Sequence, residues 1–342
     1  MIMYKVGLIG CGNIFPMHAA SVGLTPEAEL AAVCDVKEER ASQVGGRYQV
    51  PFYTDYKQMI EKEKLDAVHI LTPHYLHPQM AIYAASKGVH VLTEKPMSIS
   101  FEDAEAMVQA AAENHITLGV IFQNRYNPGS QMVKQALSDG SLGRILGAKC
   151  FVTWNRSDEY YSHSDWKGTW DKEGGGVIID QAIHTLDLLR WFVNDEIEYV
   201  DAAISNRAHS RIEVEDSAEG VIKYKNGVVT GFWAVNYYST DAPVEIEIHC
   251  EKGIAKMVAD RAIIHYNDGT EMSRDKNPDE VIDYGEGVKQ YWGVSHYKQI
   301  KEFYSDLSSG KKPFVDGHEA MKTQRMIAAI YQSGRENKRI FF

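Results

Sequence analysis

The sequence has few cysteines, no long apolar run and a deficit of positive charge, and each shortage excludes a class of protein. Its four cysteines are spread along 342 residues without a closely spaced pair, so neither a disulfide framework nor a zinc knuckle is predicted. No stretch reaches the roughly 18 uncharged apolar residues that a membrane-spanning helix needs. Lys and Arg number 36 against 47 Asp and Glu, a net charge of -11 that argues against nucleic acid or a membrane surface as partner. We therefore expect reduced thiols, a cytoplasmic location and a small-molecule partner.

The composition is that of a globular chain with a sizeable core. Hydrophobic residues make up 44% of the chain and charged residues 24%, which excludes a disordered or fibrous protein. Single hydrophobic cores stop growing at roughly 250–300 residues. Two domains are therefore predicted, at residues 1–124 and 125–342.

The first of these domains alternates short apolar runs with helical patterns, from Tyr4 to about Ile121. Such alternation predicts parallel strands with helices on both faces, because parallel strands need crossover connections and are buried on both sides. Residues 1–124 are therefore expected to form a doubly wound α/β domain.

The second domain has a different order of predicted strands and helices. Successive strand patterns run from Glu198 to about Met257, with tight turns expected at Asn226-Gly227 and Lys252-Gly253. Helical patterns cover residues 128–138, 293–308 and 317–334. Residues 125–342 are therefore predicted to form an α+β domain with an antiparallel sheet, whose final helix is able to pack back on the first domain.

A glycine-rich turn follows the first predicted strand. Gly10 and Gly12 stand one residue apart, and a helical pattern begins directly after Asn13 and Ile14. In a dinucleotide-binding βαβ unit the first glycine permits the tight turn, and the second lets backbone N–H groups approach the pyrophosphate. We expect these four residues to bind a dinucleotide. Phe15 occupies the position where a third small residue is usual, so the helix is expected to pack differently there.

Asp35 ends the second predicted strand, where an acidic side chain receives the adenosine ribose hydroxyls. A carboxylate there repels a 2′-phosphate, which favours NAD as cofactor. Lys37 and Arg40 lie nearby and leave NADP as the alternative. The other interpretation is an ordinary two-glycine turn and a solvated strand end.

Three further segments carry a resemblance. TPHYLH at residues 72–77, GVHVLTEKP at residues 88–96 and GGGVIIDQAIHTLD at residues 174–187 resemble the Gfo/Idh/MocA oxidoreductases, the glucose-fructose oxidoreductase and inositol dehydrogenase family. The resemblance extends over nearly the whole chain. It implies a Rossmann domain, a second domain built on an open, mostly antiparallel sheet, and reversible oxidation of a hydroxyl on a sugar, inositol or related polyol.

Lys95 and His184 are the main catalytic candidates. Lys95 follows the fourth predicted strand, at the sheet edge where such folds bind ligands, and its match in the family is catalytic. Asp180, His184 and Asp187 share one face of a predicted helix. His184 is the expected base, because imidazole has the pKa nearest neutral pH. Asp180 is expected to bind substrate hydroxyls or to adjust the charge of the Lys95 and His184 pair. Asp187 either orients the imidazole or forms a structural ion pair.

A metal site at Asp180 and His184 is an alternative, but no third ligand with clear spacing accompanies them and hydride transfer needs no metal. We therefore predict no metal. The second-rank cofactor contacts implied by the resemblance and by position at strand ends, beside Lys95 itself, are Thr72, Pro73, His77 and Glu94. For Glu94 the resemblance implies a contact with the nicotinamide ribose.

Substrate residues are expected in the aromatic segment before the triple glycine and just after the fifth strand. Indole and phenol rings stack on the C–H faces of a sugar while neighbouring polar groups take its hydroxyls. The candidates besides Asp180 and His184 are Arg125, Tyr161, Trp166 and Lys167. The alternative is that the aromatic rings fasten a long loop to the sheet. The lack of an arginine cluster favours an uncharged sugar or polyol over a phosphate-bearing one.

Two other functions remain open at this point. One is a glycosidase that oxidises its sugar transiently with retained NAD, and the other is a dinucleotide-binding regulator without catalysis. The strands around residues 220–238 have apolar residues on both faces, and in the family this sheet often packs on another subunit. We therefore expect a homodimer or homotetramer through Tyr224, Phe232, Trp233 and Tyr237.

Overall fold

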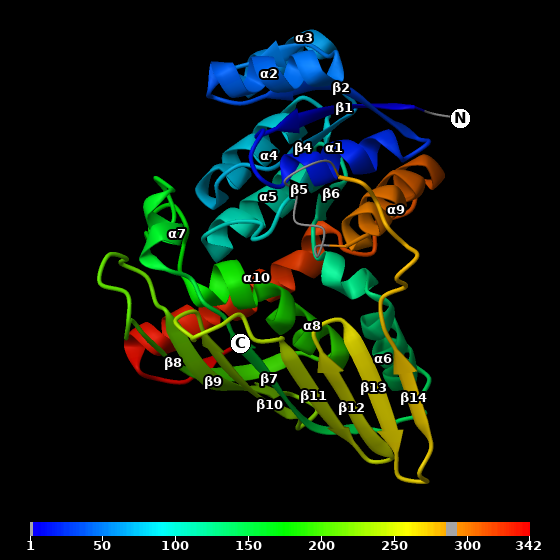
Figure 1. The fold of residues 1–342 in the computed structure, drawn as a ribbon, viewed down its shortest axis with the longest axis vertical. Helices are drawn as coiled ribbons and strands as arrows, with labels where there is room; N and C mark the ends of the chain where they lie inside the picture. Colours follow the sequence, from blue (N-terminus) through cyan, green and yellow to red (C-terminus); the bar gives the residue numbers. More distant parts are fainter. Residues whose placement is uncertain (1–2, 285–292) are drawn as a thin grey trace. The chain divides into compact units, whose positions relative to one another are not determined.

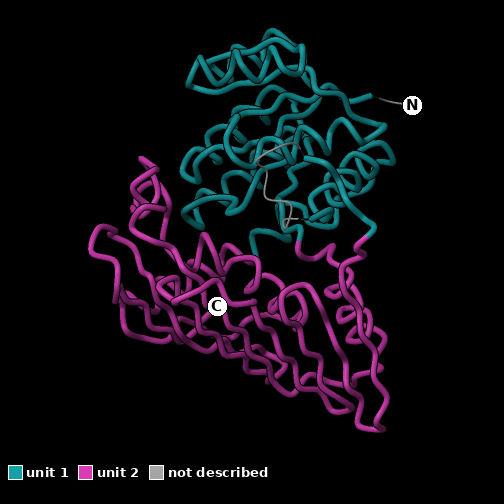
Figure 2. Tube along the Cα trace, in the orientation of Figure 1, with its two compact units in different colours: residues 1–123, 279–322 teal, residues 124–278, 323–342 magenta. Residues whose placement is uncertain are grey.

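The computed structural model describes residues 3–284 and 293–342 and divides into two compact units (Figures 1 and 2). Unit 1 comprises residues 1–123 and 279–322, and unit 2 comprises residues 124–278 and 323–342. This division differs from a single cut after residue 124, because a late helix contributes Ile300, Phe303 and Tyr304 to the core of unit 1. Nowhere in the described residues is there a helix with the length and apolar character to cross a membrane.

Unit 1 is built on a six-stranded parallel sheet in the order β3-β2-β1-β4-β5-β6. Its strands are β1 (Tyr4–Ile9), β2 (Ala28–Cys34), β3 (Phe52–Tyr53), β4 (Ala67–Ile70), β5 (His90–Thr93) and β6 (Leu118–Val120). Its helices are α1 (Phe15–Gly23), α2 (Glu38–Tyr48), α3 (Tyr56–Glu63), the 3-10 turn η1 (His74–Leu76), α4 (His77–Ser86), α5 (Phe101–Glu113) and α9 (Ser295–Ser309). The strand order reverses between β1 and β4, the point at which such sheets bind ligands.

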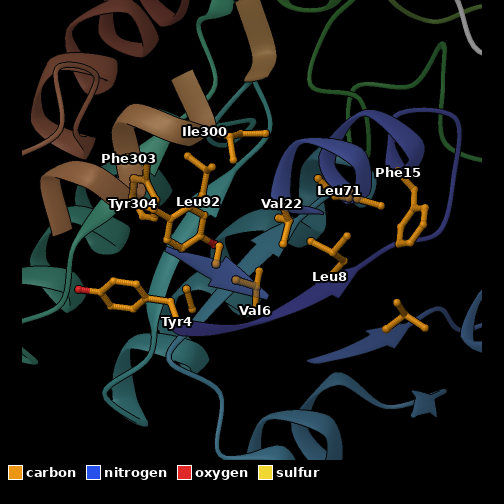
Figure 3. Packing of buried hydrophobic residues seen from close by; sticks show 14 of the residues in the cluster. Tyr4, Val6, Leu8, Phe15, Val22, Leu71, Leu92, Ile300, Phe303 and Tyr304 are labelled. Carbon is orange, nitrogen blue, oxygen red and sulfur yellow. The ribbon is translucent and has the colours of Figure 1, made fainter. Parts of the chain in front are cut away.

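The core of unit 1 joins β1 to helices from both ends of the chain (Figure 3). Val6 and Leu8 of β1 are fully buried, as is Val22 of α1, and Phe303 of α9 is 2% exposed. All four residues of β4 are buried, as expected for a central parallel strand covered on both faces. The predicted doubly wound α/β arrangement is confirmed.

Unit 2 contains a nine-stranded mixed sheet in the order β14-β13-β12-β11-β7-β10-β9-β8-β15. Its strands are β7 (Ile145–Thr153), β8 (Ile197–Ser205), β9 (Ser217–Tyr224), β10 (Val229–Val235), β11 (Glu245–Cys250), β12 (Gly253–Val258), β13 (Arg261–Tyr266), β14 (Glu271–Arg274) and β15 (Ile340–Phe341). Its helices are α6 (Pro128–Ser138), α7 (Asp158–Ser162), the π-helix η3 (Val177–Ala182) and α8 (Ile183–Val193). Two further elements, η2 (Gln123–Tyr126) and α10 (Gly317–Glu336), run across the boundary between the units.

The sheet of unit 2 is mostly antiparallel, as predicted, with one parallel pair between β7 and β10. The turn at Asn226-Gly227 joins β9 to β10, with Gly227 at a φ of 92°, and the second predicted turn joins β11 to β12. The expected end of the sheet near Met257 is wrong, because β13 and β14 extend it.

Side-chain alternation divides the four residues expected at a subunit interface. Tyr224 is fully buried and Phe232 is 5% exposed, so both belong to the core of unit 2 and are unable to contact another subunit. Trp233 points to the opposite face and is 36% exposed, near Val221 and Val229 at 37% and 40%. Tyr237 follows β10 and is half-buried. An interface on this sheet would therefore use the Trp233 face.

Candidate active site

The glycine-rich turn connects β1 to α1 at the carboxyl edge of the parallel sheet. Gly10 has a φ of 101°, and a Cβ there would lie 2.7 Å from the carbonyl oxygen of Leu71. A Cβ built on Gly12 would meet no described atom within 4 Å, so the backbone there is open to a ligand. Asn13 is exposed and Ile14 half-buried, directly before α1. This turn fits a dinucleotide pyrophosphate, because its backbone is accessible and the positive end of a helix follows.

Phe15 is accommodated by turning toward α2. Its side chain is 2% exposed and meets Tyr48 edge to face, with 5.6 Å between ring centroids. The large residue at the third position therefore packs within unit 1 and leaves the turn at Gly10 and Gly12 intact.

Asp35 follows β2 and is held by the neighbouring backbone. Its Oδ2 accepts a hydrogen bond from the N–H of Cys11 at 2.9 Å, and its Oδ1 accepts from the N–H of Lys37 at 2.9 Å. The Arg40 guanidinium lies 3.3 Å from Oδ2. A fixed carboxylate thus stands beside the glycine turn, as a ribose-binding acid requires.

His77 fastens the loop after β4 to the loop after β5. Its Nε2 lies 2.8 Å from the carbonyl oxygen of Thr72, and its Nδ1 lies 2.8 Å from that of Pro96. Burial lowers the pKa of this imidazole, although the two carbonyls oppose the effect. Both ring nitrogens are engaged by backbone, so His77 shapes the loops at Thr72 and Pro73. The Lys95-Pro96 peptide bond is cis.

Glu94 and Lys95 follow β5 at the same edge. Glu94 is 9% exposed, and its Oε2 accepts a hydrogen bond from the backbone N–H of Lys95 at 3.2 Å. His18 and His296 lie 2.9 and 3.5 Å from Oε1. Burial opposes ionisation, yet hydrogen bonds from the two imidazoles hold the pKa of Glu94 well below its ordinary value. The carboxylate beside Lys95 is therefore charged.

In unit 2 the triple glycine allows a close approach that no other residue permits. Gly175 has a φ of 154° and a Cβ there would collide with the Tyr331 hydroxyl, while a Cβ on Gly176 would collide with the carbonyl oxygen of Glu215. The buried Glu215 carboxylate accepts from the N–H groups of Gly176 and Ile178 at 2.8 and 3.0 Å. These bonds satisfy the first N–H groups of the π-helix that carries Asp180.

Asp180 lies in that π-helix, whereas His184 and Asp187 lie in α8. The single α-helical stripe expected for these three residues is therefore wrong, because residues 177–182 wind as a π-helix, a form often found at functional sites. His184 is half-buried at the start of α8.

Lys167 is the centre of a polar cluster in unit 2. Its Nζ lies 2.6 Å from Oδ2 of Asp180 and 3.3 Å from Oε1 of Glu173. It also stands 4.6 Å from the ring centroid of Trp166 and 4.9 Å from that of Tyr160. Burial lowers the pKa of the ammonium, but Asp180, Tyr160 and Glu173 outweigh burial and raise it. Lys167 is therefore charged and neutralises the Asp180 carboxylate, its nearest partner.

Glu173 is fully buried within this cluster. Burial and the nearby Asp180 carboxylate raise its pKa to about 8, against the opposing effect of Lys167. The Tyr160 hydroxyl donates to Asp180 at 2.9 Å, and the Gln181 amide donates to the same oxygen at 2.7 Å. Asp180 is thus surrounded by donors that fix its orientation.

Two of the predicted substrate residues are buried against other side chains of unit 2. Arg125 is fully buried and forms a bidentate ion pair with Asp187, and its guanidinium lies 5.4 Å from the Trp191 ring centroid. Tyr161 is 5% exposed, packs with Ile212 and accepts a hydrogen bond from the Asn236 amide at 2.7 Å. Both side chains contribute to the core of unit 2, whereas Trp166 and Lys167 are only partly buried.

Family models match both parts of the chain. Residues 4–122 match the model described as "Oxidoreductase family, NAD-binding Rossmann fold", and residues 130–256 match the "GFO/IDH/MocA C-terminal domain". The chain belongs to the GFO/IDH/MocA oxidoreductase family. The predicted family, fold class and type of enzyme are thereby confirmed, and the NAD-binding description agrees with the glycine turn.

Named relatives of this GFO/IDH/MocA protein cover nearly its full length. D-apiose dehydrogenase from Paraburkholderia graminis is 27% identical, over 98% of this chain and 89% of that protein. Myo-inositol 2-dehydrogenase from Thermotoga maritima is 25% identical, over 98% and 97%. The solved WlbA dehydrogenase from Bordetella pertussis, in complex with NADH and UDP-GlcNAcA, is 30% identical over 99% of both chains with a TM-score of 0.86.

Several residues of this GFO/IDH/MocA chain were missed by sequence reasoning. Glu173 directly precedes the triple glycine, and its place before a functional turn was the available signal. Tyr160 stood among the aromatic residues but was not distinguished from Tyr161. His18 and His69 lie within apolar helix and strand patterns, where a lone histidine gives no signal until its partners are known.

Proposed function

We propose that this chain transfers a hydride between NAD and a hydroxyl carbon of a sugar, inositol or related polyol. The main support for the proposal is the accessible turn at Gly12, which lies beside the anchored Asp35 carboxylate. The chain also belongs to an NAD-binding oxidoreductase family. Relatives named D-apiose dehydrogenase and myo-inositol 2-dehydrogenase support the substrate class. Unit 1 binds the cofactor and unit 2 provides the substrate residues.

NAD is the preferred cofactor in this proposal, and NADP is the weaker alternative. Two backbone N–H groups hold the Asp35 carboxylate, so it is not free to turn away from a 2′-phosphate. Arg40 neutralises part of its charge at 3.3 Å. The carboxylate still accepts two ribose hydroxyls far better than it tolerates a phosphate.

Lys95, Asp180 and His184 are the proposed catalytic residues. When bound, NAD accepts the hydride from the hydroxyl-bearing carbon. The His184 imidazole takes the hydroxyl proton, because its ordinary pKa lies near neutral pH. The Lys95 ammonium holds the same hydroxyl oxygen and stabilises the negative charge that develops there. Asp180, fixed by Lys167 and Tyr160, receives a neighbouring substrate hydroxyl.

The charge around Asp180 favours an uncharged substrate. Lys167 carries one positive charge and Asp180 one negative charge, while the raised pKa of Glu173 keeps that carboxyl mainly protonated at neutral pH. The charges of Lys167 and Asp180 therefore cancel, so this pair offers no net positive charge to a phosphate. A nucleotide sugar is the second candidate, because the Bordetella relative is described in complex with UDP-GlcNAcA.

The chain is also proposed to form a homodimer or homotetramer in the cytoplasm. The exposed Trp233, Val221 and Val229 supply an apolar face on the unit 2 sheet. All four cysteines are buried thiols, as suits a reducing compartment. Light scattering checks the assembly: a Trp233→Glu variant should give a smaller particle than the unsubstituted protein, and a monomeric unsubstituted protein would refute it.

The experiment that tests the function offers purified protein and NAD a panel of inositols, sugars, glycosides and UDP-sugars. Absorbance at the nicotinamide band follows NADH, and mass spectrometry of the same wells identifies the product. We expect NADH to grow with one polyol or sugar, whose product has lost two hydrogens. Cleavage of a glycoside without net NADH would instead indicate the transient-oxidation glycosidase, and tight NAD binding without any turnover would indicate a regulator.

A further inference from the structure

A chain of buried polar side chains runs through unit 1 from Glu94 to α9. His18 Nε2 lies 2.9 Å from Glu94 Oε1, and His18 Nδ1 lies 2.9 Å from Nδ1 of His69. His69 Nε2 lies 2.7 Å from the Tyr304 hydroxyl. The two imidazoles and the phenol are fully buried. Figure 3 shows Tyr304 directed from α9 toward the residues of the parallel sheet.

The direction of each hydrogen bond in this series of buried side chains follows from the charge on Glu94. An ionised carboxylate only accepts, so His18 donates from Nε2. Burial lowers the pKa of His18 and lowers that of His69 well below its ordinary value, so each imidazole is neutral and has one N–H. His18 therefore accepts at Nδ1, where His69 donates, and His69 accepts at Nε2 from the Tyr304 hydroxyl.

Because these hydrogen bonds all run in one direction, the tautomers of His18 and His69 depend on each other. If His69 donated from Nε2 instead, its Nδ1 would become an acceptor facing the acceptor of His18. His18 would then move its proton to Nδ1, and Glu94 would lose its nearest donor. A histidine held in one tautomer by the hydrogen bond at its other nitrogen is a general device for fixing a ligand or catalytic group. His296 lies 3.5 Å from Oε1 of Glu94 but is not a member of this hydrogen-bond series.

We propose that His18, His69 and Tyr304 are positioning residues, which act as one directional hydrogen-bond chain to fix the Glu94 carboxylate for binding the nicotinamide ribose. The inference rests on the proposed NAD binding and on the expected ribose contact of Glu94. His69 and Tyr304 touch neither cofactor nor substrate in this account. They act only through the tautomer of His18.

The first test is independent of activity. Nitrogen-15 NMR of the full chain with labelled histidine reads the tautomer of each imidazole at pH 7.5, and His18→Asn and His69→Asn variants assign the two signals. The expected result is a proton on Nε2 of His18 and on Nδ1 of His69. A proton on Nδ1 of His18, or an imidazolium at either residue, would overturn the proposal.

The second test measures NADH affinity by fluorescence. His69→Phe should weaken NADH binding about five- to ten-fold and Tyr304→Phe about two- to three-fold, in line with the loss of one or part of one net hydrogen bond. Tyr304→Phe keeps the buried ring, so it folds even if His69→Phe does not. Tyr297→Phe on the same helix is the matched control, because its hydroxyl makes only a 3.5 Å bond to the Leu24 carbonyl at the surface.

A purely structural role would lower the melting temperature of Tyr304→Phe and leave its NADH affinity equal to that of Tyr297→Phe. That result would contradict the positioning role. An unsubstituted protein that bound no NADH would contradict the proposed function instead. The tautomer measurement would still decide whether the directional hydrogen-bond chain exists.

Discussion

The Arg125 guanidinium donates to both carboxylate oxygens of Asp187, from Nε at 2.7 Å and from Nη2 at 2.6 Å. Both side chains are almost completely buried, and the Thr323 hydroxyl donates to the same carboxylate at 2.6 Å. An arginine expected to bind substrate is thus the partner of an aspartate expected to orient the catalytic imidazole. In the structure the two satisfy each other inside unit 2.

Removal of Arg125 should therefore affect stability before it affects substrate binding. Arg125→Met leaves the Asp187 charge buried without its bidentate partner, which costs about 3–5 kcal/mol of unfolding free energy. Denaturant unfolding measures this loss. The control is Arg144→Met, whose guanidinium pairs with Glu251 at the surface and should leave the free energy of unfolding within experimental error. A stable Arg125→Met protein with a raised KM would show that Arg125 binds substrate after all.

Lys95→Ala and His184→Ala should abolish turnover while the NAD dissociation constant stays within a few-fold. Loss of a positioned acid or base typically lowers kcat by about 10²–10⁴-fold. Steady-state kinetics with the substrate found by the panel gives kcat, and NADH fluorescence gives the affinity. His163→Ala is the matched control, because that imidazole is 73% exposed in the same part of the chain as Lys167. A fully active His184→Ala enzyme would refute the assignment of the base.

Asp35→Ala should weaken NAD binding and relax discrimination against NADP. The change removes the acceptor for the ribose hydroxyls and also frees the N–H groups of Cys11 and Lys37. Asp35→Asn separates these effects, because it keeps an acceptor oxygen but not the negative charge. Both variants lose the negative charge. Each should therefore bind NADPH more tightly, relative to NADH, than the unsubstituted protein does. Unchanged affinities in both variants would place the adenosine ribose elsewhere.

Stability should fall with rising pH because of two buried carboxyl groups. Burial raises the pKa of Glu173 to about 8 and that of Glu215 to about 7, from an ordinary value of 4.5. Each group binds its proton more tightly in the folded chain, so its stabilising contribution is complete below pH 4.5 and is lost as pH rises through these values. Melting temperatures from pH 5 to pH 9 follow the effect.

A difference between variants isolates Glu173 from the other titrating groups. Glu173→Gln does not titrate, so its melting temperature should depend less on pH between about 5 and 8 than that of the unsubstituted protein. Glu196→Gln serves as control, since that side chain is 76% exposed and pairs with Lys225 at the surface. Parallel curves for the unsubstituted protein and Glu173→Gln would mean that Glu173 is ionised throughout.

Periodicity was sufficient to predict most of the fold. The alternation between Tyr4 and Ile121 gave the parallel sheet because each strand and its crossover helix are local in sequence. The parallel pair of β7 and β10 was not predicted, since its partners lie about 80 residues apart and no local pattern specifies such pairing. The return of α9 to unit 1 was missed for the same reason.

The positions of candidate site residues in the fold could be predicted wherever a motif follows a strand. Gly10, Asp35 and Lys95 stand after β1, β2 and β5, and the carboxyl ends of parallel strands meet at one edge. Arg125 was different, because a charged residue after a strand gives the same signal whether it meets substrate or a buried partner. His69 lies in the apolar run of β4, so its contacts with His18 and Tyr304 became visible only in the folded structure.

Transfer of deuterium from the substrate to NAD is the decisive test of the proposed hydride transfer. The substrate identified by the panel is labelled with deuterium at the carbon that is oxidised, and the NADH released is analysed by mass spectrometry. We expect one deuterium in each NADH formed. NADH without the label, or a label retained in a product that forms without net NADH, would contradict this proposal.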